Sequence, residues 1–197
     1  MPYLKRDALC PEPIDCRILS AALDLFVENG FHSVSVHDIK KNADVSIGSI
    51  YNHFGGKEGI AKALNKHLLN EMDELIDDVM QSHDSPEQQC KEIIIKLLGY
   101  TETHTNIIAF IFHAKHTDFL PNEPLICDAS PFIRIREIIS QGMKQGEFIK
   151  TDPFVATSSL FGGVTKMIQL RLDGLIDKPL TDYTDMIIKT GWHGVAK

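Results

Sequence analysis

Residues 45–58 read VSIGSIYNHFGGKE, and this stretch decides the fold. Ser46 is a residue type that caps a helix with its side chain, and a short helix then extends to about Asn52. Ile50 falls on the inward side of that helix, next to Val45 and Phe54. The outward side keeps small and hydrogen-bonding residues, so it can lie close to the edges of another molecule.

Two more short helices are predicted upstream of this stretch. The first has an apolar stripe that Gly30 ends, and the stripe consists of Ile18, Leu19, Ala22, Leu25 and Phe26. Ser35 and Asp38 have the spacing of a capping box at the start of the second helix. Three short helices, the last two joined by a turn at residues 44–45, describe a helix-turn-helix. Its second helix would lie in the major groove of DNA.

The rest of the chain also shows helical periodicity and no sustained strand alternation. A long helix of about six turns is expected after residues 55–56, with an apolar face formed by Ile60, Leu64, Leu68, Met72, Leu75, Ile76 and Val79. Further helices are expected from residue 86 and near 106–116, 130–143, 153–173 and 181–192. We therefore predict an all-α fold of about nine helices, with a helix-turn-helix head at residues 1–55 and a helical-bundle body at residues 56–197.

Composition and cysteine use are those of an ordinary globular protein. The 197 residues are 43% hydrophobic and 24% charged. No run approaches ~18 apolar residues, and residues 1–13 lack the apolar core of a signal peptide, so we expect a cytoplasmic protein. No CxxC pair occurs among Cys10, Cys16, Cys90 and Cys127, which argues against a zinc finger. The cysteines are either thiols without function or a redox sensor.

The net charge of -7 is unevenly distributed. Up to Lys57, six basic and seven acidic residues give -1, so the remaining -6 lies in the rest of the chain. A near-neutral head permits DNA binding but does not argue for it. With few basic groups, one head would bind DNA weakly and with a shallow salt dependence. Two heads about 34–36 Å apart would then be needed.

Residues 18–60 resemble the DNA-binding domain of the TetR family of transcriptional regulators. The family's apolar first helix with Phe, Gly and Phe corresponds to residues 25–31, and its Thr/Ser-Val-x-x-Ile segment to residues 35–39. The family's Val-Ser-x-Gly-x-Ile/Leu-Tyr-x-His-Phe-x-x-Lys-Glu pattern corresponds to residues 45–58. The remainder resembles the family only loosely, mainly within residues 142–153. The resemblance implies a homodimeric DNA-binding regulator whose body responds to a small molecule.

Two departures from the family pattern concern the joints of the head. The family usually has Gly in the turn where this chain has Asp44, a residue type that tolerates a left-handed backbone. It usually has Ser before Lys-Glu, where this chain has Gly55, Gly56 and then Gly59. We expect a weaker cap on the long helix and a looser joint between head and body.

Carried over residue by residue, the resemblance implies which side chains meet DNA. Bases would be read by His37, Ile47, Gly48, Ser49 and Asn52. Phosphates would be anchored by Ser35, Tyr51, His53 and Lys57, the last in a helix first turn that favours an anion. The alternatives are that His37 and His53 are solvated and that Tyr51 packs against the first helix. Lys5 and Arg6 form either a DNA-contacting arm or a solvated tail.

The body is expected to hold a dimer surface and an effector cavity. The last two helices carry more apolar residues than one side of a bundle needs, namely Leu160, Phe161, Val164, Ile168, Leu172, Met186, Ile187 and Trp192. TetR-like proteins dimerise through these helices as a four-helix bundle, and a partner helix would approach over Ala156, Ser159, Gly162 and Gly163. A ligand cavity is predicted from Ile107, Phe110, Ile111, His113, Phe132, Arg136 and Phe161, with core packing as the alternative for each. Arg136 would favour an anionic ligand or pair with a nearby acid.

The favoured hypothesis is a homodimeric repressor that releases a palindromic DNA operator when an effector enters the body and tilts the long helix. A metal-dependent sensor or enzyme using His113, His116 and Asp118 is one alternative, and a helical adaptor that binds protein is another. No Ser-His-Asp order, paired carboxylates or phosphate loop is recognisable. We therefore expect neither an enzyme nor a cofactor.

Overall fold

The computed structural model describes residues 13–114, 116–121, 123 and 126–195. Within these residues the chain forms nine α-helices and no strand longer than a single bridge, which confirms the predicted all-α fold. The α-helices are α1 Ile14–Asn29, α2 Val36–Ala43, α3 Ile47–Phe54, α4 Lys57–Ser82, α5 Pro86–Thr103, α6 Thr105–Phe112, α7 Ser130–Gln145, α8 Pro153–Leu172 and α9 Thr184–Trp192. Short 3-10 helices are η1 Phe31–Ser33, η2 His116–Asp118, η3 Ile126–Asp128 and η4 Leu180–Tyr183.

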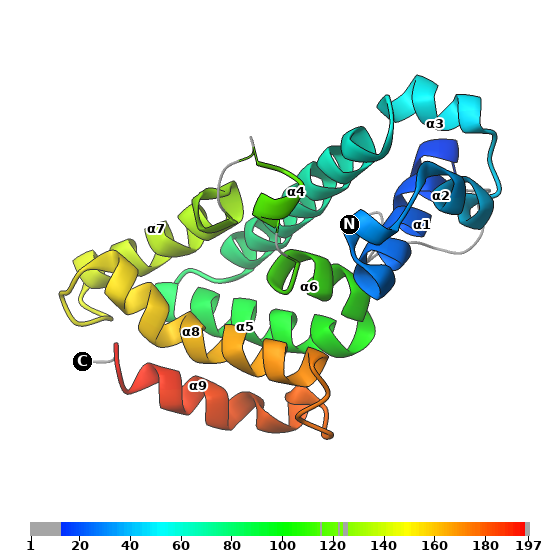
Figure 1. Ribbon diagram of the computed structural model, residues 1–197. Helices are drawn as coiled ribbons and strands as arrows, with labels where there is room; N and C mark the ends of the chain where they lie inside the picture. The colour runs from blue at the N-terminus through cyan, green and yellow to red at the C-terminus, as the bar shows by residue number, and fades with distance from the viewer. Residues whose placement is uncertain (1–12, 115, 122, 124–125, 196–197) are drawn as a thin grey trace.

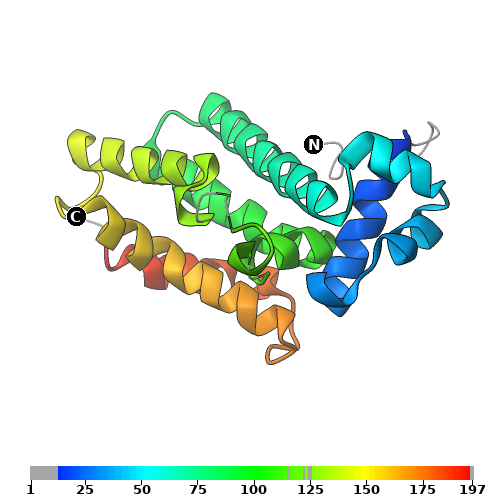
Figure 2. The same cartoon turned by 45° about the horizontal axis from the view of Figure 1, so that its top comes forward.

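The helices form a small head and a larger body (Figure 1). Helices α1–α3 make the head at one end, and α4 runs from α3 along the body. In the body, α5 packs against α4, α7, α8 and α9, and α6 packs against α1 of the head (Figures 1 and 2). The contact between α1 and α6 means that head and body meet at a second place besides α4.

Four of the nine helices in the described residues begin at a side-chain cap that the sequence pattern indicated. Both reciprocal hydrogen bonds of the capping box between Ser35 and Asp38 are formed at the start of α2. The Ser46 hydroxyl accepts a hydrogen bond from the Ser49 N–H at 3.0 Å at the start of α3. Ser85 caps α5 ahead of Pro86, and Asp152 caps α8. These caps satisfy N–H groups that would otherwise lack partners in the first turn.

One apolar core extends from the head into the body along α4. The predicted stripe of α4 is buried over its whole length, from Ile60 to Val79. Its head end lies against α1 and its far end against α5 and α7. Helix α4 is therefore held from both sides by apolar packing.

Two arginines link neighbouring helices of the body. Arg134 of α7 pairs with Asp73 and Asp77 of α4. Arg171 of α8 pairs with Glu102 of α5 at 2.9 Å. The hydrogen bonds from Arg171 lower the pKa of Glu102, which is therefore ionised at neutral pH.

The structure corrects the predicted ends of two helices. Helix α6 ends at Phe112, before His116, and His116 instead begins η2. The α6 ladder is lost there because the Ala114 N–H donates to the Ala109 carbonyl, five residues back. The last helix is preceded by η4, so its α-helical part begins at Thr184. No helix in the described ranges is long and apolar enough to cross a membrane. Lys5, Arg6 and Cys10 lie outside the described residues.

Candidate nucleic-acid interface and ligand cavities

The turn between α2 and α3 is held by its own backbone and by Arg17. Asp44 adopts the left-handed conformation, with φ 51° and ψ 54°, as the sequence predicted. The Arg17 guanidinium of α1 donates hydrogen bonds to the carbonyl oxygens of Ala43, at 2.6 Å, and of Asp44. Sequence reasoning counted Arg17 only as a charge. Its signal is a lone basic residue at the edge of an otherwise apolar helix stripe.

Helix α3 has one side in the core and one side exposed. Ile50 is fully buried, and Val45 and Phe54 pack against the same core, as predicted. Of the predicted base-reading residues, Gly48, Asn52 and the α2 residue His37 are exposed, and Ile47 and Ser49 are half-buried. The exposed side of α3 is therefore small and polar.

Gly48 is not required by packing within the subunit. A Cβ at this position would meet only the Ser46 hydroxyl, at 3.7 Å, which is ordinary contact. Its φ lies in the normal helical region, because the only glycines with positive φ among the described residues are elsewhere. The folded subunit would thus accept a side chain at residue 48, and glycine leaves room for something outside it.

The predicted phosphate anchors fall into two groups. Ser35, Tyr51 and His53 are exposed on the head, with 54% of Tyr51 accessible. The exposure disfavours the alternative that Tyr51 packs against α1. Ser35 also donates from its hydroxyl to Asp38, at 2.6 Å, and the hydrogen bonds from Ser35 lower the pKa of Asp38.

Lys57 differs from the other anchors because its ammonium is already engaged. The Nζ atom donates to the carbonyl oxygens of Phe31, at 3.0 Å, and of Val34, at 2.8 Å. It also lies 4.2 Å from the centre of the Phe31 ring. Lys57 thereby joins the start of α4 to the loop after α1. A phosphate role for Lys57 stays a prediction, and the geometry shows a structural role first.

The joint between α3 and α4 has the weak cap that the sequence predicted, but it is tight. Gly56 precedes α4 and forms no side-chain cap. A Cβ at Gly59, however, would lie 1.7 Å from the Phe54 carbonyl oxygen. The end of α3 therefore touches the first turn of α4, which only glycine permits. Gly59 makes the joint closer instead of looser.

The body encloses a cavity of about 370 Å³, called the body cavity below, between α6, α7 and α8. It is lined by Met72, Leu97, Ile111, Phe112, Ala114, His116, Cys127, Phe132, Ile135, Arg136, Phe154, Thr157, Ser158, Phe161, Gly162, Val164, Thr165, Ile168 and Gln169. Four predicted ligand residues are among them: Ile111, Phe132, Arg136 and Phe161. Arg136 donates to the Cys127 carbonyl oxygen at 2.8 Å and lies 4.5 Å from the Phe154 ring centre, and its guanidinium pairs with no acid among the described residues.

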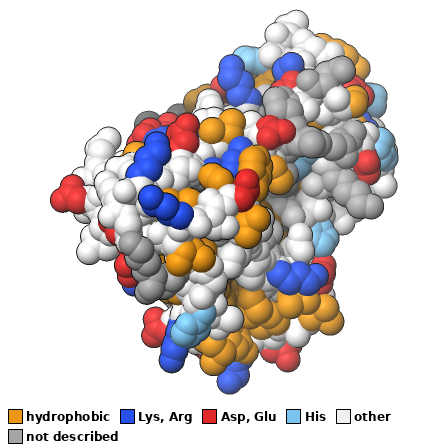
Figure 3. Space-filling view, turned by 90° about the vertical axis from the view of Figure 1, so that its left-hand side faces the viewer, with side chains coloured by type: hydrophobic (Ala, Val, Ile, Leu, Met, Phe, Trp, Pro, Cys, Tyr) orange, Lys and Arg blue, Asp and Glu red, His pale blue; other side chains and the backbone are white. Residues whose placement is uncertain are grey.

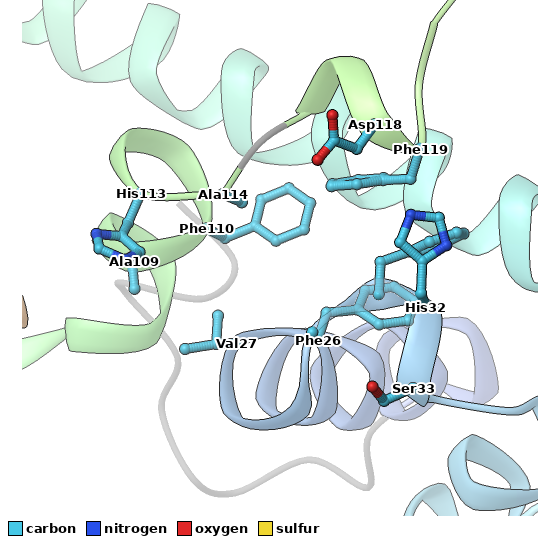
Figure 4. A pocket seen from close by; sticks show the side chains of 12 residues that line it. Phe26, Val27, His32, Ser33, Ala109, Phe110, His113, Ala114, Asp118 and Phe119 are labelled. Carbon is cyan, nitrogen blue, oxygen red and sulfur yellow. The ribbon is translucent and has the colours of Figure 1, made fainter.

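The other predicted ligand residues lie elsewhere. A second cavity of about 390 Å³, the junction cleft, lies between the head and the body (Figure 4). It is lined by Phe26, Val27, Gly30, Phe31, His32, Ser33, Ala109, Phe110, His113, Ala114, Asp118 and Phe119. Phe110 and His113 therefore face the junction cleft, because α6 presents them on the side toward α1. Ile107 lines neither cavity and is buried in the core.

Known proteins share the head sequence and the whole fold. The regulator UidR of Escherichia coli is 45% identical over 53 residues, which cover 27% of each chain. The probable regulator YttP of Bacillus subtilis is 28% identical over 145 residues, which cover 68% of this chain and 66% of YttP. The aligned parts thus span less than two thirds of either relative.

Solved structures agree over more of the chain. A TetR family transcription regulator from Marinobacter aquaeolei superimposes with a TM-score of 0.79 and 17% identity, covering 93% of this chain and 96% of that one. FadR from Bacillus subtilis, solved in complex with stearoyl-CoA, gives 0.69 and 20% identity, covering 90% and 97%. These likenesses show the fold. Residues 18–64 match the family described as "Bacterial regulatory proteins, tetR family". The head therefore carries the DNA-binding domain of the TetR family, and the whole chain has the fold of that family's regulators.

The resemblance predicted a dimer surface on the last two helices, α8 and α9. Leu160, Val164 and Ile168 are buried within the subunit, so these three residues belong to its own core and the prediction that they exceed its needs is wrong. They are covered because α8 also packs against α5, α6 and α7. The outer side of α8 is open: a Cβ on Gly162 or Gly163 would meet no atom within 4 Å.

The three residues of the metal alternative, His113, His116 and Asp118, are not brought together as a set of metal ligands. The Nε2 atom of His113 lies 3.7 Å from Oδ1 of Asp173, and among the described residues His113 forms no ion pair with Asp118. His116 packs edge-on against Phe110, with ring centres 5.1 Å apart, and burial lowers its pKa. Searched over the described residues, no group of three His, Cys, Asp or Glu could hold a metal ion. The thiol of Cys90 is buried, which raises its pKa and makes it unreactive.

Proposed function

We propose that this protein is a homodimeric DNA-binding transcriptional repressor that binds a palindromic operator through α3 and is released by a small-molecule effector. One observation carries the DNA-binding part: α3 is fixed from below by the buried Ile50 and keeps a small, polar, exposed side. Such a helix fits a major groove, where Asn side chains and small residues approach base edges. The head would comprise residues 1–55 and the body residues 56–197.

The homodimer part is supported by an open face on the body. Helix α8 exposes Val155, Ser159, Gly162 and Lys166 at helical spacing, and 59% of Val155 is accessible. Met186 of α9 is 68% accessible. Figure 3 shows hydrophobic side chains in patches on one face of the molecule, among charges of both signs. A second α8 could lie against the two glycines, which would bring two heads onto one DNA duplex.

The effector part is supported by the lining of the body cavity. Among its described lining residues, Arg136 alone carries a formal charge, and the walls are mainly apolar. An amphipathic molecule with an apolar chain and an anionic group matches this lining. The similarly folded FadR of Bacillus subtilis was solved with stearoyl-CoA, a molecule of this kind. We infer that the effector enters beside Arg136 and shifts α7 and α8 relative to α4.

The DNA-binding claim is tested by selecting sequences from a random DNA pool and measuring mobility shifts on the enriched site. Asn52→Ala should weaken binding to that site by about 1–3 kcal/mol and leave binding to random DNA unchanged. Asn70→Ala, an equal truncation on the exposed side of α4, is the matched control. No enriched sequence from a folded protein, or equal loss on both kinds of DNA, would contradict the proposal.

The effector claim is tested on the same complex with dodecanoate and stearoyl-CoA. Either compound should release the DNA, and dodecanol, which lacks the anionic group, should act more weakly. Arg136→Gln should reduce the response, whereas Lys144→Gln, an exposed change elsewhere on α7, should not. An Arg136→Gln protein that responds like the unchanged protein would refute the assigned role of Arg136.

A further inference from the structure

The junction cleft and the body cavity have similar volumes but opposite charge. Among the described residues that line the junction cleft, Asp118 alone carries a formal charge at neutral pH. In the body cavity that residue is Arg136. A ligand that suits one cavity is therefore disfavoured in the other.

Aromatic rings from both parts of the molecule form the walls of the junction cleft. Phe26 and Phe31 belong to the head, whereas Phe110 and Phe119 belong to the body. The rings of Phe31 and Phe119 are stacked across the junction, with centres 4.7 Å apart and an angle of 17° between their planes. Figure 4 shows Phe110 and Phe119 on one side of the space and Phe26 and Val27 on the other. Phe31 is already covered by Phe119 and by the Lys57 ammonium, which lies 4.2 Å from its ring centre. The other ring faces toward the space can hold a flat apolar ring and attract positive charge.

Polar groups are confined to the edges of the same space. In Figure 4 the carboxylate of Asp118 lies above Phe119, and His32 and Ser33 approach from the head. Asp118 is exposed, so its negative charge is accessible to a molecule that enters from solvent. The cleft thus combines an aromatic interior with an anionic rim.

We propose that the junction cleft is a second ligand site, for a planar aromatic molecule that carries a cationic group such as an ammonium. The Phe rings hold the plane of the ligand, and Asp118 pairs with its cation. A volume of about 390 Å³ suits a ligand of a few fused rings.

Ligand binding at this place is linked to the position of the head. Because Phe26 and Phe31 move with the head and Phe110 and Phe119 with the body, the site is complete only in one mutual placement. A ligand that binds this placement most tightly stabilises it. Reciprocally, any event that moves the head away from this placement weakens ligand binding. The effect on DNA affinity rests on the proposed function, whereas the binding site does not.

Tryptamine is a suitable probe, with indole-3-acetate as the same ring bearing the opposite charge. Isothermal titration with the full chain should show tryptamine binding more tightly than indole-3-acetate. Asp118→Asn should lower the affinity for tryptamine by about threefold to fivefold, which is the range expected for the loss of a partly exposed ion pair. Asp128→Asn removes an equal charge from η3, outside both cavities, and should change nothing.

A competition experiment separates the two cavities. Dodecanoate should not displace tryptamine, and Arg136→Gln should leave tryptamine binding unchanged. The site is refuted if tryptamine does not bind at millimolar concentration, if Asp118→Asn equals Asp128→Asn, or if dodecanoate displaces the probe. DNA enters none of these measurements, so failure of the regulator proposal and failure of this site give different results.

Discussion

The head and the body of this protein use their basic side chains differently. The carbonyl oxygens of the head accept hydrogen bonds from Arg17 of α1, which also pairs with the exposed Asp44 carboxylate, and from Lys57 at the start of α4. In the body, Arg134 and Arg171 bond mainly to carboxylates on neighbouring helices, and each adds one bond to a main-chain carbonyl oxygen. Carbonyl groups in a turn have fixed positions, so the head bonds specify one backbone shape. Ion pairs between long side chains can re-form after helices shift by a small distance.

From this difference we infer that the head presents α3 to DNA and that the body responds to the effector. The head keeps α3 in one orientation, and the body cavity and the junction cleft, whose walls are mainly apolar, lie in the body and at its border with the head. Rigid presentation of a DNA-reading helix and an adaptable ligand-binding bundle are what a switch needs. The joint at Gly59 and Lys57 then decides how motion of the body reaches the head.

The largest effect on stability is expected from a substitution that disrupts the joint between α3 and α4. Gly59→Ala places a Cβ against the Phe54 carbonyl oxygen and should lower the free energy of unfolding by about 3 kcal/mol. Gly99→Ala is the matched control within helix α5, where a Cβ meets no atom within 4 Å. That control should be neutral or gain up to about 1 kcal/mol from helix propensity. Urea unfolding of both variants measures the difference, and equal stabilities would show that the joint is not tight.

A smaller effect sharpens the contrast between backbone bonds and ion pairs. Lys57→Met keeps the apolar stem but loses both carbonyl bonds, so the unfolding free energy should fall by about 2 kcal/mol. Lys62→Met, on the same helix, loses an exposed pair with Glu123 and should cost under about 1 kcal/mol. Equal costs would remove the distinction between main-chain hydrogen bonds and exposed ion pairs. Unchanged stability with weaker DNA binding would instead support the phosphate role of Lys57.

The smallest effect concerns pH and the body. Burial lowers the pKa of His116 below its ordinary value of 6.5, so the unfolded chain binds a proton more readily than the folded chain. Stability is therefore complete above pH 6.5 and decreases as the pH falls toward the lowered pKa. His116→Phe should reduce the loss of stability between pH 7 and 5.5, although His104, whose pKa is also lowered by burial, retains its share. An unchanged pH slope in urea unfolding would contradict this account.

The head was predictable from sequence because its signals are local. Ser35, Asp38 and Ser46 act on N–H groups within three residues, and Ile50 is buried by a periodicity that spans one helix. Asp44 was expected to accept a left-handed backbone because it stands where the family has Gly and because aspartate tolerates that conformation. The carbonyl partners of Lys57 were not predictable, because they lie 23 and 26 residues away and are not encoded in any residue type.

The body was less predictable because periodicity shows which side of a helix is apolar but not what covers it. Leu160 and Val164 were expected at a dimer surface, yet they fill the subunit core because several helices converge on α8. Phe110 and Ile111 are consecutive and were assigned to one cavity. Neighbouring positions on a helix point about 100° apart, so they line two cavities instead.

Gly48→Gln tests the central claim most directly, because residue 48 has room for a side chain in the folded subunit and none against a DNA duplex. The account predicts that the variant melts at the same or a higher temperature, since glutamine favours helix, and loses at least about tenfold in affinity for the selected DNA site. A Gly48→Gln protein that is fully folded and binds that site as tightly as the unchanged protein would show that α3 does not enter the groove.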